Sequence, residues 1–260
     1  MPYREKKIYS GKMFEVEIYP ISLKEKNKSR KAKMKESLPK QKNLNDKNAR
    51  KHLIRLANTN FTDQDLGVHL TYTNKTLPKT EAEARADVVN YIRRVKHYRK
   101  KNGLPPLKYL GVTEFSEPDK EDKRDKRKKV RMHHHLFMSG MDRDTLEKLW
   151  GKGRANADRL QEDEFGYTSL ANYIAKDPKG NRRWIQSKNL SQPNYRPPND
   201  SKYNKRKVIN LARNCDDREI FEKAYPGYRY LDCEVKVNDE TDAIYLYIRM
   251  REKDQIPKRE

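Results

Sequence analysis

Three consecutive histidines, His133, His134 and His135, are the residues of this sequence best suited to chemistry. They lie in residues 130–138, a largely apolar run with charged residues before it and Gly140 after it, which is typical of a β-strand. Strand side chains alternate between faces, so His133 and His135 project together while His134 projects the other way. The alternative is that the triplet is an accident of a basic sequence. If the pattern is functional, the paired imidazoles could bind one divalent metal ion.

A carboxylate on a neighbouring strand could complete this metal site. Residues 107–115 predict a strand that pairs with residues 130–138 through a charged hairpin loop, and Glu114 lies near its end. One carboxylate and two imidazoles leave coordination positions open for a substrate. This mixed ligand set suits Mn²⁺, and Mg²⁺ less well because Mg²⁺ prefers an octahedron of oxygen ligands. Alternatively, Glu114 is a surface carboxylate paired with a nearby lysine.

A tyrosine and a lysine could supply a nucleophile and its activating charge. Tyr173 and Lys176 lie three residues apart in a helix predicted over residues 168–176, so they share a face. A phenol with a pKa of about 10 is a weak nucleophile unless a cation stabilises its phenolate. The alternative is that Tyr173 packs in the core and Lys176 is a solvated charge. Tyr167 is a rival nucleophile, but it aligns with the apolar side of the helix and is expected to anchor the core.

Hydrophobic periodicity predicts the elements that must position these residues. Residues 66–73 alternate as a strand, and residues 80–101 form an amphipathic helix whose first turn has a capping box, Thr80 and Glu83. The remaining expected elements are a hairpin at residues 7–20, helices at residues 45–58 and 142–150, and a hairpin at residues 228–250. This order predicts an α+β fold: a central antiparallel sheet with helices packed on one face, extended by a β-hairpin at each end.

The charge balance points to a polyanionic partner. The chain has 60 Lys+Arg against 38 Asp+Glu, a formal net charge of +22, which costs self-repulsion in a protein without such a partner. Residues 24–42 hold nine Lys/Arg and two Glu with little apolar content, and we expect a mobile basic arm. The alternative for this segment is a solvated linker.

Other classes of protein receive little support from the sequence. No apolar run of transmembrane length and no signal peptide are present, and no phosphate-binding loop indicates an ATPase. Cys215 and Cys233 are isolated, without metal-binding or redox spacing, which is typical of a reducing cytosol. We therefore expect a cytoplasmic protein with no membrane partner.

Three ordered motifs resemble those of the rolling-circle replication initiators of the HUH endonuclease superfamily, in the branch found in bacterial plasmids and phage. They are a strand at residues 68–73, the His-x-His strand at residues 133–136, and Tyr-x-x-Lys at residues 173–176. The resemblance covers about residues 66–190. His134 departs from the family pattern, which has an aliphatic residue there. One tyrosine at the catalytic position resembles the single-tyrosine class.

The resemblance implies a fold, a mechanism and a division of the chain. The sheet is expected to be HUH/RRM-like, within an endonuclease domain at residues 63–195, between an N-terminal extension at 1–62 that carries the basic arm and a C-terminal extension at 196–260 packed on the core. Glu114, His133 and His135 are implied to bind Mn²⁺ or Mg²⁺. Tyr173 is implied to attack single-stranded DNA and form a 5′-phosphotyrosine, with Lys176 stabilising negative charge.

Nucleic-acid contacts are expected at hydroxyls and cations on the same elements. The candidates are Thr71, Thr73, Arg131, Arg93 and Arg94. The expected partners are single-stranded DNA and an origin duplex or hairpin, with a host helicase as a further candidate, in the cytoplasm of a bacterial host. Two alternatives remain open: a non-catalytic basic nucleic-acid-binding protein with structural histidines, and the same chemistry used by a transposase or relaxase.

Overall fold

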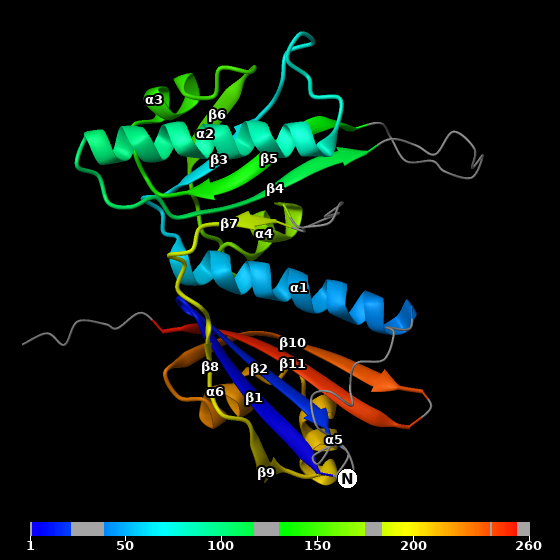
Figure 1. The fold of residues 1–260 in the computed structure, drawn as a ribbon. Coiled ribbons are helices and arrows are strands. Elements are labelled where there is room, and N and C mark those ends of the chain that lie inside the picture. Colours follow the sequence, from blue (N-terminus) through cyan, green and yellow to red (C-terminus); the bar gives the residue numbers. More distant parts are fainter. Residues whose placement is uncertain (1, 22–38, 117–129, 175–183, 240, 254–260) are drawn as a thin grey trace, which may run out of the picture. The chain divides into compact units, whose positions relative to one another are not determined.

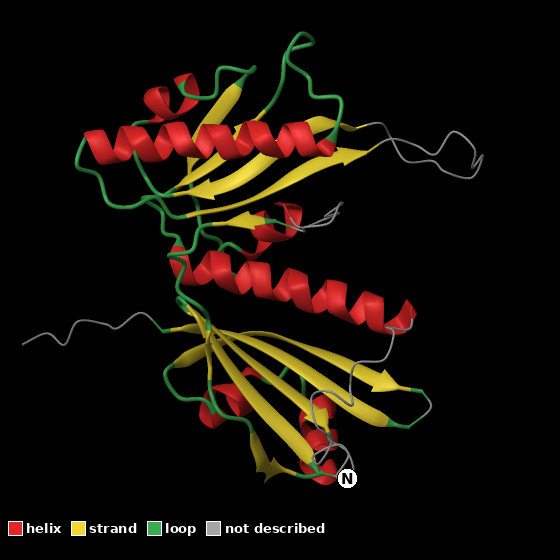
Figure 2. Ribbon diagram, viewed as in Figure 1, coloured by secondary structure: helices red, strands yellow, loops and turns green. Residues whose placement is uncertain are grey.

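The computed structural model describes residues 2–21, 39–116, 130–174, 184–239 and 241–253 of the chain. These residues form helices and two antiparallel sheets (Figures 1 and 2), which confirms the predicted α+β class. The chain divides into two compact units, each with its own sheet. We call residues 60–163 and 167–191 the central unit, and residues 1–59, 164–166 and 192–260 the terminal unit.

The central unit contains a sheet of five antiparallel strands. In spatial order these are β6 (Ala155–Arg159), β3 (Leu66–Leu70), β5 (Val130–Met138), β4 (Tyr109–Ser116) and β7 (Ile185–Gln186). β5 therefore lies at the centre, between β3 and β4. The expected pairing of β4 with β5 is confirmed. The charged loop that joins these two strands lies mostly outside the described residues, at 117–129.

Helix α2 (Glu81–Lys101) covers one face of this sheet. Thr80 caps the helix as predicted, because its side chain accepts a hydrogen bond from the backbone N–H of Glu83. The buried stripe of the helix packs against one alternating set of strand side chains, together with residues from the short helix α3 (Arg143–Lys148). This core includes Val88, Tyr91, Ile92 and Val95 of α2, Leu66, Val68 and Leu70 of β3, Leu136 and Met138 of β5, and Leu146 of α3. The histidines of β5 are thus fixed on a strand whose other side chains are clamped by a packed core.

The terminal unit contains the second sheet, which both ends of the chain build together. Its strands are β10 (Tyr228–Asn238), β11 (Ala243–Glu252), β2 (Met13–Pro20), β1 (Tyr3–Ser10) and β8 (Asn194–Tyr195) in spatial order, with β9 (Asn199–Tyr203) also paired to β1. The two predicted hairpins are confirmed. Because β11 pairs with β2, the hairpins share one sheet, a long-range pairing that local periodicity does not reveal.

Three helices accompany this second sheet: α1 (Pro39–Asn60), α5 (Lys205–Arg213) and α6 (Arg218–Ala224). α1 begins earlier than predicted and includes the end of the expected basic arm, whose residues 24–38 lie outside the described part of the chain. Sequence patterns had led to no expectation for α5 and α6. Among the described helices, none has the length and hydrophobicity needed to span a lipid bilayer.

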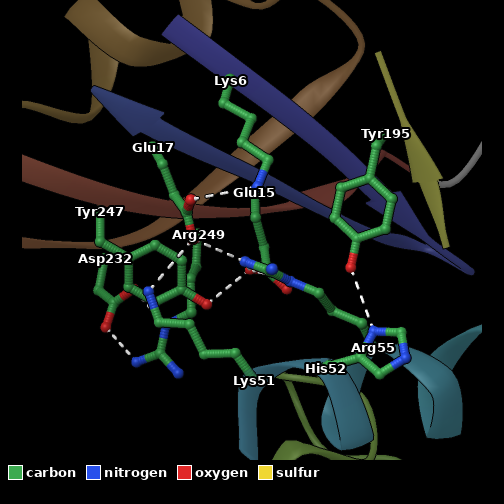
Figure 3. Close-up of polar contacts among 10 residues, drawn as sticks. All are labelled: Lys6, Glu15, Glu17, Lys51, His52, Arg55, Tyr195, Asp232, Tyr247 and Arg249. Carbon is green, nitrogen blue, oxygen red and sulfur yellow. Dashed lines mark hydrogen bonds and ion pairs between the residues drawn. The ribbon is translucent and has the colours of Figure 1, made fainter. Parts of the chain in front are cut away.

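A buried ionic network joins α1 to the terminal sheet (Figure 3). Nη2 of Arg55 lies 2.6 Å from Oε2 of Glu15 and 2.9 Å from Oε1 of Glu17. The hydroxyl of Tyr247 also donates a hydrogen bond to Glu15, and Nζ of Lys51 lies 3.3 Å from Glu17. We call these five residues the Arg55 network. Each buried carboxylate in it has a cationic partner, which is the condition under which ions are tolerated in a protein interior.

Candidate metal centre

Three imidazoles meet on the sheet face of the central unit that is opposite α2. His69 of β3 is the direct cross-strand partner of His135 on β5, so both project from one face. Their rings are stacked, with centroids 4.6 Å apart and an interplanar angle of 5°. His133 lies edge-on to both rings, with centroids 5.1 Å from His69 and 4.8 Å from His135. One ligand nitrogen from each of the three lies within 4.8 Å of the others, so they could share one metal ion.

Glu114 reaches the same group from β4. It is the cross-strand partner of His133, and its Oε2 lies 3.3 Å from Nε2 of His133 and 3.6 Å from Nε2 of His135. The structure therefore brings together the three ligands expected from sequence, Glu114, His133 and His135, and adds His69. We call these four residues the histidine centre.

The hydrogen bonding of His133 indicates which kind of ligand the centre suits. Its Nδ1 lies 2.7 Å from the backbone oxygen of Arg131, and because a carbonyl oxygen can only accept, Nδ1 carries the proton. In the neutral ring, Nε2 then presents a lone pair toward the carboxylate of Glu114. Nε2 of His69 is buried and has no hydrogen-bond partner among the described residues. Facing acceptors and a buried orphan nitrogen both fit a divalent cation, so the donor set suits the implied metal.

Protonation equilibria favour the neutral imidazoles of His135 and His69. Burial, assisted by His133 and His69, lowers the pKa of His135 to about 3. Burial also lowers the pKa of His69, again with a contribution from His133. Since a metal binds only the neutral form of imidazole, these shifts keep the ligand atoms available near neutral pH.

His134 projects into the core on the opposite face, as strand alternation predicts. It is 1% exposed, and its two ring nitrogens lie 2.7 Å from the hydroxyl of Tyr72 and 2.9 Å from that of Thr113. Burial lowers its pKa to about 3, so the ring is neutral and both nitrogens are satisfied. His134 is therefore a structural residue, not a ligand.

The proposed nucleophile lies on α4 (Thr168–Ile174), which follows Tyr167. The side chain of Tyr173 is not among those described, and Lys176 lies outside the described residues, so the roles of both stay predictions. Tyr167 is buried, with its ring centroid 6.3 Å from that of Phe137, and its expected role as a core anchor is confirmed. Because Phe137 is two residues from His135, α4 begins on the face that carries the histidine centre (Figure 1).

The expected nucleic-acid contacts fall into two groups. Arg131 shares the face of His133 by alternation, and its Nη1 donates to Oδ1 of Asn74, next to Thr73. Thr71 and Thr73 lie just beyond β3, where their side chains hydrogen-bond to the oxygen of Arg154 and to Thr76, respectively. The structure thus places Arg131 beside the segment that follows β3, on the sheet face that carries the histidine centre.

Arg93 and Arg94 form the second group, on α2. Arg94 donates to the backbone oxygens of Leu149 and Trp150 and so caps the end of α3, and Arg93 donates a hydrogen bond to Asn90 of its own helix. Because α2 covers the opposite face of the sheet, these arginines are not directed at the histidine centre. Their expected contact with nucleic acid stays a prediction.

His69 was not expected as a ligand from the sequence. By strand alternation, His69 lies on the face of β3 away from Val68 and Leu70, and the structure agrees. Alternation does not show that β3 pairs with β5 in the register that places His69 beside His135. The feature of the sequence that could have indicated His69 as a ligand is its position in the strand of the first motif, on the face away from the core.

Comparison with known families gives one match. Residues 65–178 match the model of the family described as Replication-associated protein ORF2/G2P. The matched segment begins just before β3 and includes the whole histidine centre, α4 and Lys176. This similarity supports a role in the initiation of DNA replication. No curated protein and no solved structure gives a significant match to the chain.

Proposed function

We propose that this chain nicks and rejoins single-stranded DNA at a replication origin, through a 5′-phosphotyrosine intermediate. The observation that supports the proposal best is the histidine centre: three imidazoles and a carboxylate gathered on one sheet face, inside the segment that matches a replication-associated family. A purely structural cluster would be expected to satisfy its own buried nitrogens, as His134 does.

His69, His133, His135 and Glu114 would hold the divalent ion. With three imidazoles among the ligands, the set favours Mn²⁺ over Mg²⁺. When bound, such an ion supplies a Lewis acid that polarises a phosphodiester and stabilises its developing charge.

The chain's own side chains carry out the transfer. The oxygen of Tyr173 attacks phosphorus, the bond from phosphorus to the 3′ oxygen breaks, and the departing oxygen takes up a proton to become a 3′-hydroxyl. The 5′ phosphate is then esterified to Tyr173. Lys176 lowers the cost of the phenolate and of the charge on the pentavalent phosphorus. Attack by a 3′-hydroxyl reverses the sequence and rejoins the strand, so no external energy source is required.

Arg131 would position the substrate. It is exposed on the face of the histidine centre and hydrogen-bonded to the segment that follows β3. A guanidinium binds phosphate oxygens in a bidentate manner, so Arg131 could hold the backbone of the bound strand beside the scissile bond.

The covalent intermediate provides the test. Labelled single-stranded origin DNA is incubated with the protein and Mn²⁺ and separated on a denaturing gel. The wild type should form an adduct that a chelator prevents. Tyr173→Phe, which removes only the attacking oxygen, should abolish the adduct and leave DNA affinity nearly unchanged. Tyr167→Phe is the matched control and should retain the adduct.

Two outcomes would contradict the proposal. An adduct that persists in Tyr173→Phe and disappears in Tyr167→Phe would assign the nucleophile to Tyr167. Metal-independent DNA binding by the wild type without any adduct would instead support a non-catalytic nucleic-acid-binding protein.

A further inference from the structure

Helix α5 of the terminal unit exposes a strongly basic face. Val208 and Leu211 are buried and pack in the core of this unit, which fixes one side of the helix against the sheet. Arg206 and Arg213 lie on the opposite side and Lys205 lies at its flank, and all three are exposed. The helix therefore has a fixed orientation, and its cations point to solvent.

These cations are not neutralised locally. No ion pair or hydrogen bond joins the side chains of Lys205, Arg206 or Arg213 to any other residue that the structure describes. The neighbouring helix α6 behaves differently, because Arg218 pairs with Glu222 and Lys223 pairs with Glu219, each one turn away on the same helix. The surplus positive charge of α5 is thus a local property of one helix face, and no acidic side chain of the described part offsets it.

The space beside α5 has a uniform chemical character. A space of about 900 Å³ beside α5 is open to solvent. The described residues that line it all lie on this helix or at its N-cap: Asn204, Lys205, Arg206, Lys207, Ile209, Asn210 and Arg213. These described residues comprise four cations, two amides and one aliphatic side chain, and none of them is a carboxylate or an aromatic residue. Cations and amides are the groups that bind phosphates and the edges of bases.

We propose that α5 binds double-stranded DNA by entering its major groove with this basic face, which we call the α5 face. Arg206 and Arg213 are seven residues apart, about 10 Å along the helix axis. The major groove is about 12 Å wide, so the two guanidinium groups can reach phosphates or guanine edges on either side while Asn210 faces the base pairs between them. The surface lies outside residues 65–178, which match the replication-associated family.

Other anionic partners fit the α5 face less well. Proteins that bind single strands without sequence preference stack bases on aromatic side chains, and no aromatic residue is among the described residues that line this space. A helix that lies on a membrane turns its apolar side to the lipid, whereas Val208 and Leu211 of α5 are committed to the core. A rigid helix with a polar, cationic outer face is the arrangement that the major groove accepts.

The inference deepens the proposed function. It rests on that function in one respect, because the proposed function is what identifies the bound duplex as origin DNA. Nicking is assigned to the central unit and duplex binding to the α5 face of the terminal unit. The two can therefore be tested separately in the full-length protein.

The experiment compares two double variants of equal charge change. Arg206→Ala with Arg213→Ala removes two unpaired cations from the α5 face, and Arg218→Ala with Lys223→Ala removes two paired cations from α6. Affinity for duplex DNA is measured from low to moderate salt. The α5 variant should bind at least about tenfold more weakly. Its slope of log affinity against log salt should be shallower by about 1.8, since each phosphate contact contributes about 0.9. The α6 variant should match the wild type in both duplex affinity and the salt dependence of that affinity.

Three results would overturn the inference: equal losses in both double variants, an unchanged duplex affinity in the α5 variant, or a loss for single-stranded DNA as large as that for duplex. Circular dichroism confirms that the variants are folded. The adduct assay on a short saturating oligonucleotide separates the two proposals. If the wild type forms no adduct but its duplex binding depends on α5, the nicking proposal fails and the α5 proposal stands. If the wild type forms the adduct but its duplex binding does not depend on α5, the α5 proposal fails and the nicking proposal stands.

Discussion

The Arg55 network of the terminal unit and the histidine centre of the central unit both gather ionisable side chains on an antiparallel sheet. In the Arg55 network, Arg55 contacts both Glu15 and Glu17, and Tyr247 donates a further hydrogen bond to Glu15 (Figure 3). In the histidine centre, the buried Nε2 of His69 has no partner among the described residues, and a carboxylate faces Nε2 of His133. One cluster is closed by its own counter-charges and the other is not.

The difference separates a structural role from a functional one. Desolvated charges are stable only when paired, so a closed network holds two elements together and has no capacity for a ligand. Three imidazoles beside a carboxylate stabilise the fold poorly, because a buried ring nitrogen of His69 has no partner among the described residues, but they match the requirements of a divalent cation. The predictions below test whether the two clusters differ in this way.

The largest effect is expected from opening the Arg55 network. Arg55→Ala leaves Glu15, which is 3% exposed, without its guanidinium, and breaking a buried pair costs about 3–5 kcal/mol in unfolding free energy. Denaturant unfolding followed by amide hydrogen exchange in β2 and β11 measures this loss. The control is Lys223→Ala, which breaks an exposed pair on α6 and should leave stability unchanged. Equal stability of the two variants would show that the network does not support the terminal unit.

A smaller effect on stability, but a large one on metal affinity, is expected at His69. His69→Ala should weaken Mn²⁺ binding by more than about 100-fold, because losing a partner outside the ligand set already costs about 10–100-fold. Titration calorimetry gives the affinity. His97→Ala, an exposed histidine on α2, is the matched control and should bind normally.

His134→Ala completes this test of the histidine centre. It removes a buried side chain with two hydrogen bonds and should chiefly destabilise the fold. A loss of metal affinity at His134 as large as that at His69 would contradict the assignment of the two sheet faces.

The smallest expected effect is a difference between the two units in how their stability depends on pH. Burial lowers the pKa of His134 from 6.5 to about 3, so its contribution to stability is present above pH 6.5 and is lost as pH falls toward 3. Burial alone would raise the pKa of Glu17, but the charges of Arg55, Lys51 and Lys6 outweigh it and lower that pKa below 4.5. The contribution of Glu17 is therefore present above pH 4.5 and lost only below it. When the metal is chelated and the pH is lowered, the unfolding free energy of the central unit should therefore fall before that of the terminal unit.

Both tryptophans, Trp150 and Trp184, lie in the central unit, so their fluorescence reports its unfolding alone. Hydrogen exchange in β2 reports the terminal unit. A denaturation midpoint of the fluorescence signal that stays constant between pH 6.5 and pH 4.5 would show that the buried histidines do not couple to folding.

Much of the local structure could be predicted because its causes lie within a few residues. The capping residue Thr80 marked the start of α2, and the period of two assigned His134 to the core and His133 and His135 to the opposite face. The pairing of β4 with β5 followed from their adjacency in the chain, which placed Glu114 beside His133. These features depend on backbone periodicity and on short connections, which one sequence displays directly.

Other features depended on contacts between distant segments. The addition of His69 required β3 to pair with β5 in one register, and a shift of one residue would have turned it into the core. The shared sheet of the two terminal hairpins, the closure of the Arg55 network and the outward orientation of the α5 cations are likewise products of tertiary packing. The sequence determined which side chains were available and which face of each element they occupied. Only the tertiary structure decided which of them meet, because pairing between strands far apart in the chain depends on the packing of the whole sheet.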